Sequence, residues 1–314
     1  MKIGTWNVLS LYRSGALKLL VDQLLKYKVD ITAIQEMRWK GNGIIDKKEC
    51  VILYSCDPKN HQFGTGFIVR KEVKHLIINF KPISERVSVL RIKGRFFNCS
   101  LINVHAPTET KSDEEKEAFY ALLERTFDSC PSNDIKMVIG DLNAQIGKEE
   151  MYYPTIGKYS LHDSSNDNEQ RLIEFATYKG MVIGGTFYCH KEIHKGTWKM
   201  PDGNVVNQID HIVIDKKQKK YLLDVRNFRG ANIDSDHFLV IAKVRQKISN
   251  CKKARSSRDR DQAKEKYNIE NLKNDGTVLN YRPKQRMEQE FEKIQLMELV
   301  MRLELMMNGK QLRK

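Results

Sequence analysis

The sequence predicts an α/β protein in which two packed β-sheets are covered on their outer faces by helices. Three observations lead to this prediction: the chain opens with a strand, a helix and a strand, two series of short β-rich segments follow, and amphipathic segments lie between them. The chain has 314 residues, 40% of them hydrophobic, which is enough to bury one large core. We therefore expect one main domain followed by an extension.

The opening segment shows both strand and helix patterns. Residues 2–7 form a short apolar-rich run, which predicts a strand. Apolar residues then recur at the spacing of a buried helix face, at Leu17, Leu20, Val21, Leu24 and Leu25. Residues 30–35 are rich in β-branched side chains and short enough for a buried strand, so a β-α-β unit is expected.

The next part of the chain is typical of a meander of strands. Runs rich in β-forming residues alternate with short polar breaks, at 51–54, 66–69, 76–80, 87–92 and 96–104. No helix is predicted in this part.

Strands and helices alternate again in the second half. Ser112 and Glu115 have the spacing of a capping box, which predicts the start of a helix whose apolar stripe includes Phe119 and Phe127. A strand is expected at 137–139 and a second helix at 170–179. The last series of strands is predicted at 181–184, 208–214, 222–228 and 237–244.

Composition changes near residue 247, which we take as a domain boundary. From Lys243 onward there are 19 Lys and Arg against 10 Asp and Glu, so this stretch carries about +9 of the total net charge of +14. We expect a main domain over 1–247 and a basic, partly disordered tail over 248–314 that contacts phosphates outside the active site. Helical spacing returns at 288–305, where a marginal amphipathic helix is possible.

The overall charge favours a polyanionic partner, because clustered Lys and Arg gain affinity by releasing counterions from phosphates. The six cysteines show no metal-ligand spacing, and reduced thiols are expected. No secretory signal or membrane-spanning segment is visible. These features predict an intracellular protein, nuclear or cytoplasmic, that binds a polyanion and no membrane, and they indicate no obligate protein partner.

Polar residues recur where the predicted apolar runs end. The set comprises Asn7, Glu36, His105, Asp141, Asn143, Asp210, Ser235, Asp236 and His237. In a layered α/β protein, strand ends deliver side chains to a shared crevice. Oxygen ligands with an imidazole nearby suit Mg²⁺-assisted hydrolysis of a phosphodiester, whereas the cysteines that zinc would favour are missing from the set.

Six short blocks, in this order, resemble the motif series of the endonuclease/exonuclease/phosphatase (DNase I-like) family. They are Thr5-Trp6-Asn7-Val8, Ile34-Gln35-Glu36, Asn103-Val104-His105-Ala106-Pro107-Thr108, Gly140-Asp141-Leu142-Asn143-Ala144, Gln208-Ile209-Asp210-His211 and Ser235-Asp236-His237. The resemblance covers roughly residues 1–247. It implies a four-layer α-β-β-α sandwich.

Within this family, four further segments are similar to endonucleases of RTE-clade LINE retrotransposons and to craniofacial development protein 2-like sequences. These segments are 103–109, 161–167, 194–202 and 225–231. The resemblance implies a Mg²⁺-dependent DNA endonuclease that nicks one strand, as in LINE-type retrotransposition. Two alternatives stay open: a phosphodiesterase of the same fold acting on RNA or a phosphoinositide, and a catalytically silent, domesticated protein that binds DNA or chromatin.

The resemblance also implies roles for single residues. Glu36 is implied as the principal ligand of Mg²⁺, for which Mn²⁺ is a possible substitute, with Asn7 and Asp236 beside it. Asp141, oriented by Asn143, would position or deprotonate the attacking water.

Other residues are implied to contact the phosphate. His237, held by Asp210, would stabilise it as charge develops. His105 and Thr108 depart from the family pattern, which has Tyr and Asn at these positions, yet both can still donate a hydrogen bond to phosphate.

Thr197, Trp198 and Arg171 are candidate DNA contacts. A half-buried core aromatic is the alternative for Trp198. For Arg171, the alternative is a surface residue whose aliphatic stem lies along a helix.

Overall fold

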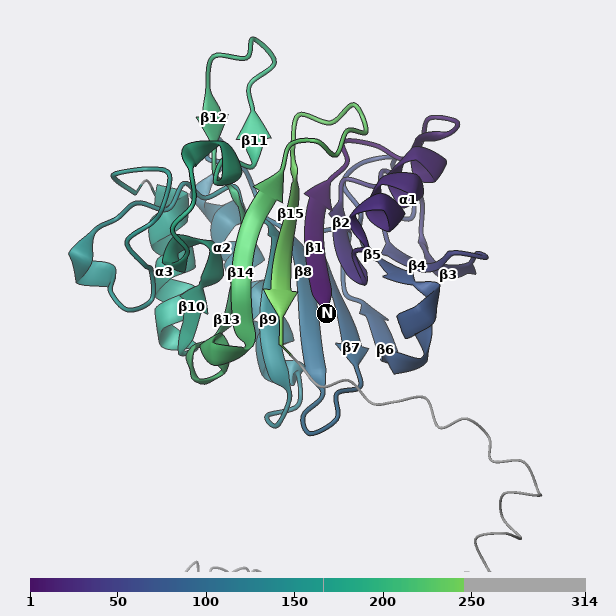
Figure 1. Cartoon of the computed structure of the whole chain (residues 1–314), viewed down its shortest axis with the longest axis horizontal. Helices are drawn as coiled ribbons and strands as arrows, with labels where there is room; N and C mark the ends of the chain where they lie inside the picture. The colour runs from purple at the N-terminus through teal and green to yellow at the C-terminus, as the bar shows by residue number, and fades with distance from the viewer. Residues whose placement is uncertain (166, 246–314) are drawn as a thin grey trace, which may run out of the picture. The chain divides into compact units, whose positions relative to one another are not determined.

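Two β-sheets stack face to face in the computed structural model (Figure 1), which describes residues 1–165 and 167–245. The predicted tail, 248–314, and the helix expected at 288–305 lie outside the described residues. The first sheet has seven strands in the order β14 (Leu222–Phe228), β15 (Leu239–Val244), β1 (Lys2–Asn7), β2 (Ile31–Gln35), β5 (Thr65–Arg70), β4 (Cys50–Ser55) and β3 (Asn42–Asp46). The second has six, in the order β10 (Met181–Ile183), β13 (Asp210–Asp215), β9 (Ile135–Asp141), β8 (Cys99–His105), β7 (Val87–Ile92) and β6 (Ile77–Pro82).

Each sheet contains one parallel pair of strands in an otherwise antiparallel arrangement. In the first sheet β1 runs parallel to β2, and in the second β8 runs parallel to β9. Parallel strands end at the same edge of a sheet. The polar residues that end these four strands are therefore delivered to a common edge.

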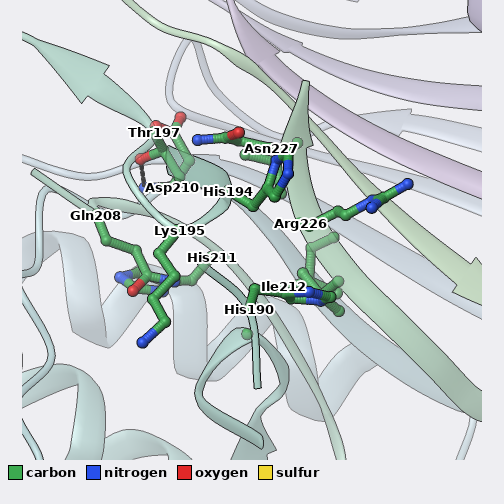
Figure 2. A pocket seen from close by; sticks show the side chains of 13 residues that line it. His190, His194, Lys195, Thr197, Gln208, Asp210, His211, Ile212, Arg226 and Asn227 are labelled. Carbon is green, nitrogen blue, oxygen red and sulfur yellow. Dashed lines mark hydrogen bonds between the residues drawn. The ribbon is translucent and has the colours of Figure 1, made fainter. Parts of the chain in front are cut away.

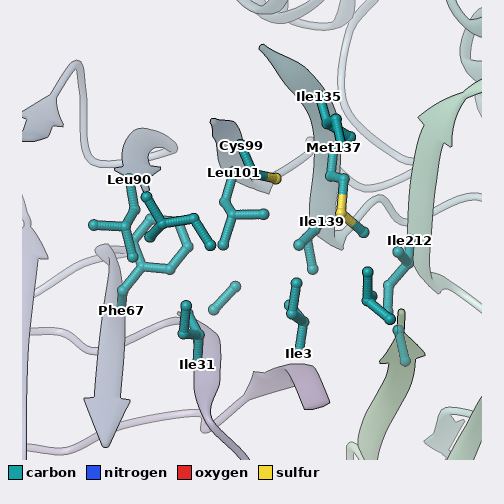
Figure 3. Close-up of a cluster of buried hydrophobic side chains, with 14 of the residues drawn as sticks. Ile3, Ile31, Phe67, Leu90, Cys99, Leu101, Ile135, Met137, Ile139 and Ile212 are labelled. Carbon is teal, nitrogen blue, oxygen red and sulfur yellow. The ribbon is translucent and has the colours of Figure 1, made fainter. Parts of the chain in front are cut away.

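The main core lies between the sheets (Figure 3). Ile3, Ile31 and Phe67 from the first sheet meet Leu101 and Ile139 from the second, and all five are fully buried. Side chains alternate between the two faces of a strand, so each strand sends every second residue into this core. A side chain of this size gains about 1.5–3 kcal/mol when it is removed from water.

Helices cover the outer face of each sheet. Helix α1 (Ala16–Tyr27) packs through Leu20 and Leu24 on the first sheet. Helices α2 (Asp113–Ser129) and α3 (Asp167–Tyr178) pack on the second sheet. The helix–sheet–sheet–helix order agrees with the predicted α/β class. The predicted start of this helix is also confirmed, because the Ser112 hydroxyl oxygen accepts a hydrogen bond from the backbone N–H of Glu115.

The predicted strands and helices are present, and the differences lie in short or exposed elements. Strand β3 was missed because it is an exposed sheet edge and lacks an apolar pattern. The expectation of no helix in the meander was wrong, since a 3₁₀ helix, η1 (Lys71–Leu76), precedes β6. The small hairpin of β11 (Trp198–Lys199) and β12 (Val206–Asn207) was also missed, because two-residue strands carry too little pattern.

The remaining irregular segments include four more short 3₁₀ helices: η2 (Glu150–Tyr152), η3 (Gly184–Phe187), η4 (Glu192–His194) and η5 (Lys216–Tyr221). The β11–β12 hairpin projects beyond the sheets at the end of β1 opposite the N-terminus (Figure 1). Within the two described ranges, none of the helices has the length and apolar character needed to cross a membrane.

Candidate active site

The predicted polar residues meet at one edge of the stacked sheets. In the second sheet, His105 at the end of β8 lies opposite Asp141 at the end of β9, and Asp141 lies opposite Asp210 at the start of β13. In the first sheet, Asn7 ends β1 and Glu36 directly follows β2. The two sheets therefore contribute to the cluster from opposite sides.

Local backbone geometry fixes two of these carboxylates. Glu36 has a positive φ of 56°, so the chain turns sharply where β2 ends. Gly140 precedes Asp141 with φ 154°, and a Cβ there would lie 2.0 Å from the carbonyl oxygen of Val104. Only glycine permits this close approach of β8 and β9, which seats Asp141 beside its neighbours.

Asp141 is the centre of the cluster. Its Oδ2 accepts a hydrogen bond from Asn7 Nδ2 at 2.9 Å, and its Oδ1 accepts one from the backbone N–H of Asn143 at 3.1 Å. The Nε2 atoms of His237 and His105 lie 3.7 and 3.9 Å from Oδ2. Burial, together with the charge of nearby Asp210, raises the pKa of Asp141.

Glu36 is tied to the cluster and stays ionised. Asn7 Nδ2 donates to its Oε1 at 3.0 Å, and Arg38 Nη2 donates to its Oε2 at 2.6 Å. Burial opposes ionisation, but His105 in its protonated form and the hydrogen bonds from Arg38 and Asn7 outweigh it and lower the pKa of Glu36. Asn7 therefore bridges a carboxylate from each sheet.

His237 and Asp210 form a buried imidazole–carboxylate pair. His237 Nδ1 donates to Asp210 Oδ2 at 3.0 Å. Burial alone would lower the pKa of His237, but the charges of Asp210 and Asp141 raise it to about 9. The imidazole is therefore a cation at neutral pH.

Thr197 and Trp198 form hydrogen bonds to Asp210 and to Asp236, the residue before His237. The Thr197 hydroxyl oxygen accepts from the backbone N–H of Asp210 at 3.0 Å (Figure 2) and from that of Ile209 at 2.9 Å. A cavity of about 10 Å³ lies beside Thr197 and Asp210. Trp198 Nε1 donates to Asp236 Oδ2 at 2.8 Å, so the β11–β12 hairpin is anchored to the site.

His105, unlike His237, is a neutral imidazole at neutral pH. Its Nε2 lies 3.8 Å from Glu36 Oε1, and within the described part of the chain its Nδ1 has no hydrogen-bond partner. Burial lowers the pKa of His105, and the nearby Asp141 and Glu36 only partly oppose this. The cluster therefore holds one cationic and one neutral imidazole beside Asp141 Oδ2.

The oxygen-rich donor set fits a hard divalent cation such as Mg²⁺. One atom each of Asp141, Asp210 and His237 lie within 4.8 Å of one another, a grouping that differs from the predicted ligands Glu36, Asn7 and Asp236. In the metal-free protein His237 is a cation, so it would have to lose a proton before its Nε2 could bind a metal ion, whereas the carboxylates need no such change. Asp236 Oδ1 is buried and, in residues 1–165 and 167–245, has no hydrogen-bond partner.

Thr108 lies beside the cluster in an open pocket of about 390 Å³ that Glu36 and His105 also line. Sequence reasoning missed Arg86, which lines the same pocket. Its guanidinium carbon lies 3.9 Å from the centre of the Phe63 ring, and its Nη1 donates to the His105 carbonyl oxygen at 3.1 Å. Arg86 and Phe63 lie between the strands of the meander, where no motif distinguishes them from surface residues.

Helix α3 carries one predicted DNA contact, Arg171, and one residue that sequence reasoning missed, Asn168. Arg171 pairs with Asp113 at 3.0 Å and with Asp167 at 3.2 Å, and the structure does not bring it into the cluster. Asn168, which was missed, donates through Nδ2 to the carbonyl oxygens of Asn143 and Pro107 at 3.1 and 3.2 Å. It thereby holds together the loops that follow β8 and β9.

The charge of His237 predicts a pH-dependent stability in the metal-free protein. Its folded pKa of about 9 exceeds the ordinary value of 6.5, so it contributes stability that is fully present below about pH 6.5 and is lost as pH rises through about 9. We expect the free energy of unfolding to fall over this window, and the fall to shrink by on the order of 3 kcal/mol in His237→Gln. Denaturant titrations between pH 6 and 10 measure it.

The same pH dependence in His237→Gln as in the wild type would mean that His237 does not carry the charge.

A layered pair of sheets with acidic and imidazole groups at one edge defines the class of phosphoester hydrolases with a DNase I-like fold. Residues 4–237 match the model of the Endonuclease/Exonuclease/phosphatase family, and the chain belongs to this family. It is 32% identical over 246 residues to craniofacial development protein 2 of Bos taurus, covering 78% of this chain and 41% of that protein. The chain thus spans less than half the length of this curated relative.

Solved structures share the fold at low sequence identity. The catalytic domain of Xenopus laevis APE2 has a TM-score of 0.59 at 16% identity, covering 80% of this chain and 94% of that one. The endonuclease domain of TRAS1, a telomere-specific non-LTR retrotransposon, has a TM-score of 0.53 at 14% identity, covering 78% and 97%. The 3′ phosphatase NExo from Neisseria, bound to a product DNA hairpin, has a TM-score of 0.55 at 20% identity, covering 78% and 99%.

Proposed function

We propose that this chain is a Mg²⁺-dependent DNA endonuclease that nicks one strand, as in LINE-type retrotransposition. The observation that carries the proposal is the arrangement around Asp141. Its Oδ2 lies 3.7 Å from the cationic His237 and 3.9 Å from the neutral His105, and Asn7 bridges it to Glu36. This arrangement offers an anionic metal site, a carboxylate to aim water and a cation to meet developing charge.

Glu36 is the proposed principal ligand of Mg²⁺ or Mn²⁺, with Asn7 and Asp236 beside it. The side chains of Glu36 and Asp236 are 17% and 26% exposed, so both are accessible from solvent, unlike Asp210. When bound, the ion would neutralise charge on the phosphate oxygens as a Lewis acid.

Asp141 is the proposed group that positions the attacking water or takes its proton. Its raised pKa brings its basicity closer to what a general base needs near neutral pH. Asn143 fixes the carboxylate through its backbone N–H, and its own side chain donates to the Ala106 carbonyl oxygen at 2.9 Å. The carboxylate is therefore held before substrate arrives.

His237 is the proposed stabiliser of the phosphate, because its charge is in place before the reaction and Asp210 fixes its orientation. His105 and Thr108 are proposed to donate hydrogen bonds to the phosphate from the pocket side. Thr197 acts on this proposal through Asp210, whose backbone it holds.

DNA is the proposed substrate. Arg38, Arg86 and Lys111 line the pocket beside Glu36, where they can contact the phosphates that flank the scissile bond. The hydrogen bond from Trp198 to Asp236 places the projecting β11–β12 hairpin next to the acidic cluster (Figure 1), where it can contact a groove of the DNA. The TRAS1 endonuclease domain and the DNA-bound NExo structure share this fold and support the choice. A nuclear or cytoplasmic location follows from this proposal.

Comparing substrates tests the proposal. With Mg²⁺ present, supercoiled plasmid should convert to open circles before any linear form accumulates, because one strand is cut at a time. Single-stranded RNA and soluble phosphoinositide headgroups should react at least about a hundredfold more slowly, since they lack the duplex phosphates that the basic pocket would hold.

Two outcomes would contradict the proposal. Faster cleavage of RNA or of a phosphoinositide would assign the site to another substrate of the same fold. Tight DNA binding without any cleavage in Mg²⁺ or Mn²⁺ would support the catalytically silent alternative.

A further inference from the structure

A buried polar bridge joins the two sheets directly beneath the acidic cluster. Gln35, next to Glu36, donates from Nε2 to Asn103 Oδ1 at 2.6 Å. Gln35 Oε1 in turn accepts from the hydroxyl of Thr5 at 3.2 Å. Gln35 and Asn103 have no exposed surface, so no bulk water can replace these hydrogen bonds.

Asn103 belongs to β8 of the second sheet, yet its side chain is bonded to the first. Its Nδ2 donates to the carbonyl oxygens of Ile34 on β2 at 2.9 Å and of Gly66 on β5 at 2.7 Å. With the bond from Gln35, one side chain is held by the opposite sheet at three points. Since buried polar groups must keep their partners, these bonds fix the sheets relative to each other at this level.

The bridge lies next to the groups that act on substrate. Glu36 follows Gln35 directly on the first sheet, and His105 comes two residues after Asn103 on the same face of β8. Glu36 Oε1 and His105 Nε2 are only 3.8 Å apart although they come from different sheets. Their separation therefore depends on the spacing of the sheets at the bridge.

We propose that Gln35 and Asn103 are positioning residues, whose bridge holds Glu36 at its working distance from His105 and Asp141. The inference rests on the proposed function, because it concerns the same metal and phosphate site. Disrupting the bridge weakens metal binding and slows turnover without changing any group that touches substrate.

A second bridge offers an internal control. Thr65 lies opposite Gln35 on β5, and Ser88 lies opposite Asn103 on β7. Thr65 Oγ1 donates to Ser88 Oγ at 3.0 Å, and both residues are fully buried. This hydrogen bond joins the same two sheets at the same level but ends on no side chain adjacent to the cluster.

The test compares Asn103→Leu with Thr65→Val. Both substitutions keep an approximately similar volume and remove buried hydrogen bonds between the sheets. Mn²⁺ affinity is measured by calorimetric titration, kcat and KM by cleavage of a DNA duplex, and folding by the thermal midpoint. In Asn103→Leu we expect the Mn²⁺ dissociation constant to rise and kcat to fall, each about tenfold or more, with KM within about threefold. Thr65→Val should keep all three constants within about threefold of wild type.

Thr5→Val is a milder variant that keeps the fold if Asn103→Leu does not. It removes one hydrogen bond to Gln35 and should shift Mn²⁺ affinity and kcat in the same direction by a smaller factor. Wild-type Mn²⁺ affinity in folded Asn103→Leu, or in Thr5→Val if only that variant folds, would overturn the inference. An equal loss in Thr65→Val would also overturn it, because the effect would then be general to sheet packing. Wild-type protein that binds Mn²⁺ but cuts no DNA would contradict the proposed function instead, and the Mn²⁺ affinities would still decide the role of the bridge.

Discussion

Replacing Asp141 by asparagine is expected to lower kcat about a thousandfold or more while leaving DNA affinity within about threefold of wild type. Asparagine keeps the shape of the side chain and can still accept a hydrogen bond from the backbone of Asn143. It removes the charge that would aim the water or take its proton. Single-turnover cleavage and DNA binding in Ca²⁺, measured on the same preparation, separate the two effects.

Asp134→Asn is the matched control. Asp134 is also a buried, hydrogen-bonded aspartate, but it lies just before β9 rather than at its end, and it pairs with Arg91 at 2.7 Å. This variant should lose stability and keep wild-type turnover. Wild-type turnover in Asp141→Asn would exclude Asp141 from its proposed role.

Local strand periodicity predicted where these strands end. The expected α/β layering then predicted that the side chains at those ends meet. Asn7, Glu36, Asp141 and Asp210 each follow or begin an apolar run, and the structure brings all four to one edge. The strands of each parallel pair, β1 with β2 and β8 with β9, end at the same edge, which brings their last residues together. A layered α/β fold thus places strand-end residues together even where they are more than a hundred positions apart in sequence.

Other features of the site depend on contacts that no local pattern records. Arg86 was missed because its importance comes from stacking on Phe63 and bonding to His105, which belong to different segments. The different charge states of His105 and His237 also could not be predicted, since they depend on burial and on which carboxylates lie close in space. Arg171 forms ion pairs with Asp113 and Asp167 on the outer helices, and its contact with DNA stays a prediction.

Two variants test which residues bind the metal ion. Glu36→Gln should lower Mn²⁺ affinity strongly, because it removes a charge from a hard-oxygen site while keeping the hydrogen bond from Asn7 possible. His237→Gln should leave Mn²⁺ affinity unchanged or stronger, because it removes a nearby positive charge. This pair of variants therefore distinguishes the proposed ligand set from the geometric grouping of Asp141, Asp210 and His237.

Metal dependence of strand nicking tests the central claim most directly. Supercoiled plasmid is incubated with the full chain in Mg²⁺, in excess EDTA, and in EDTA followed by excess Mg²⁺ or Mn²⁺. Because the proposed ligands are oxygens that bind hard divalent cations, open circles should form in Mg²⁺, stop forming in EDTA, and return when either metal is restored. Nicking that continues at the full rate in EDTA would contradict the account.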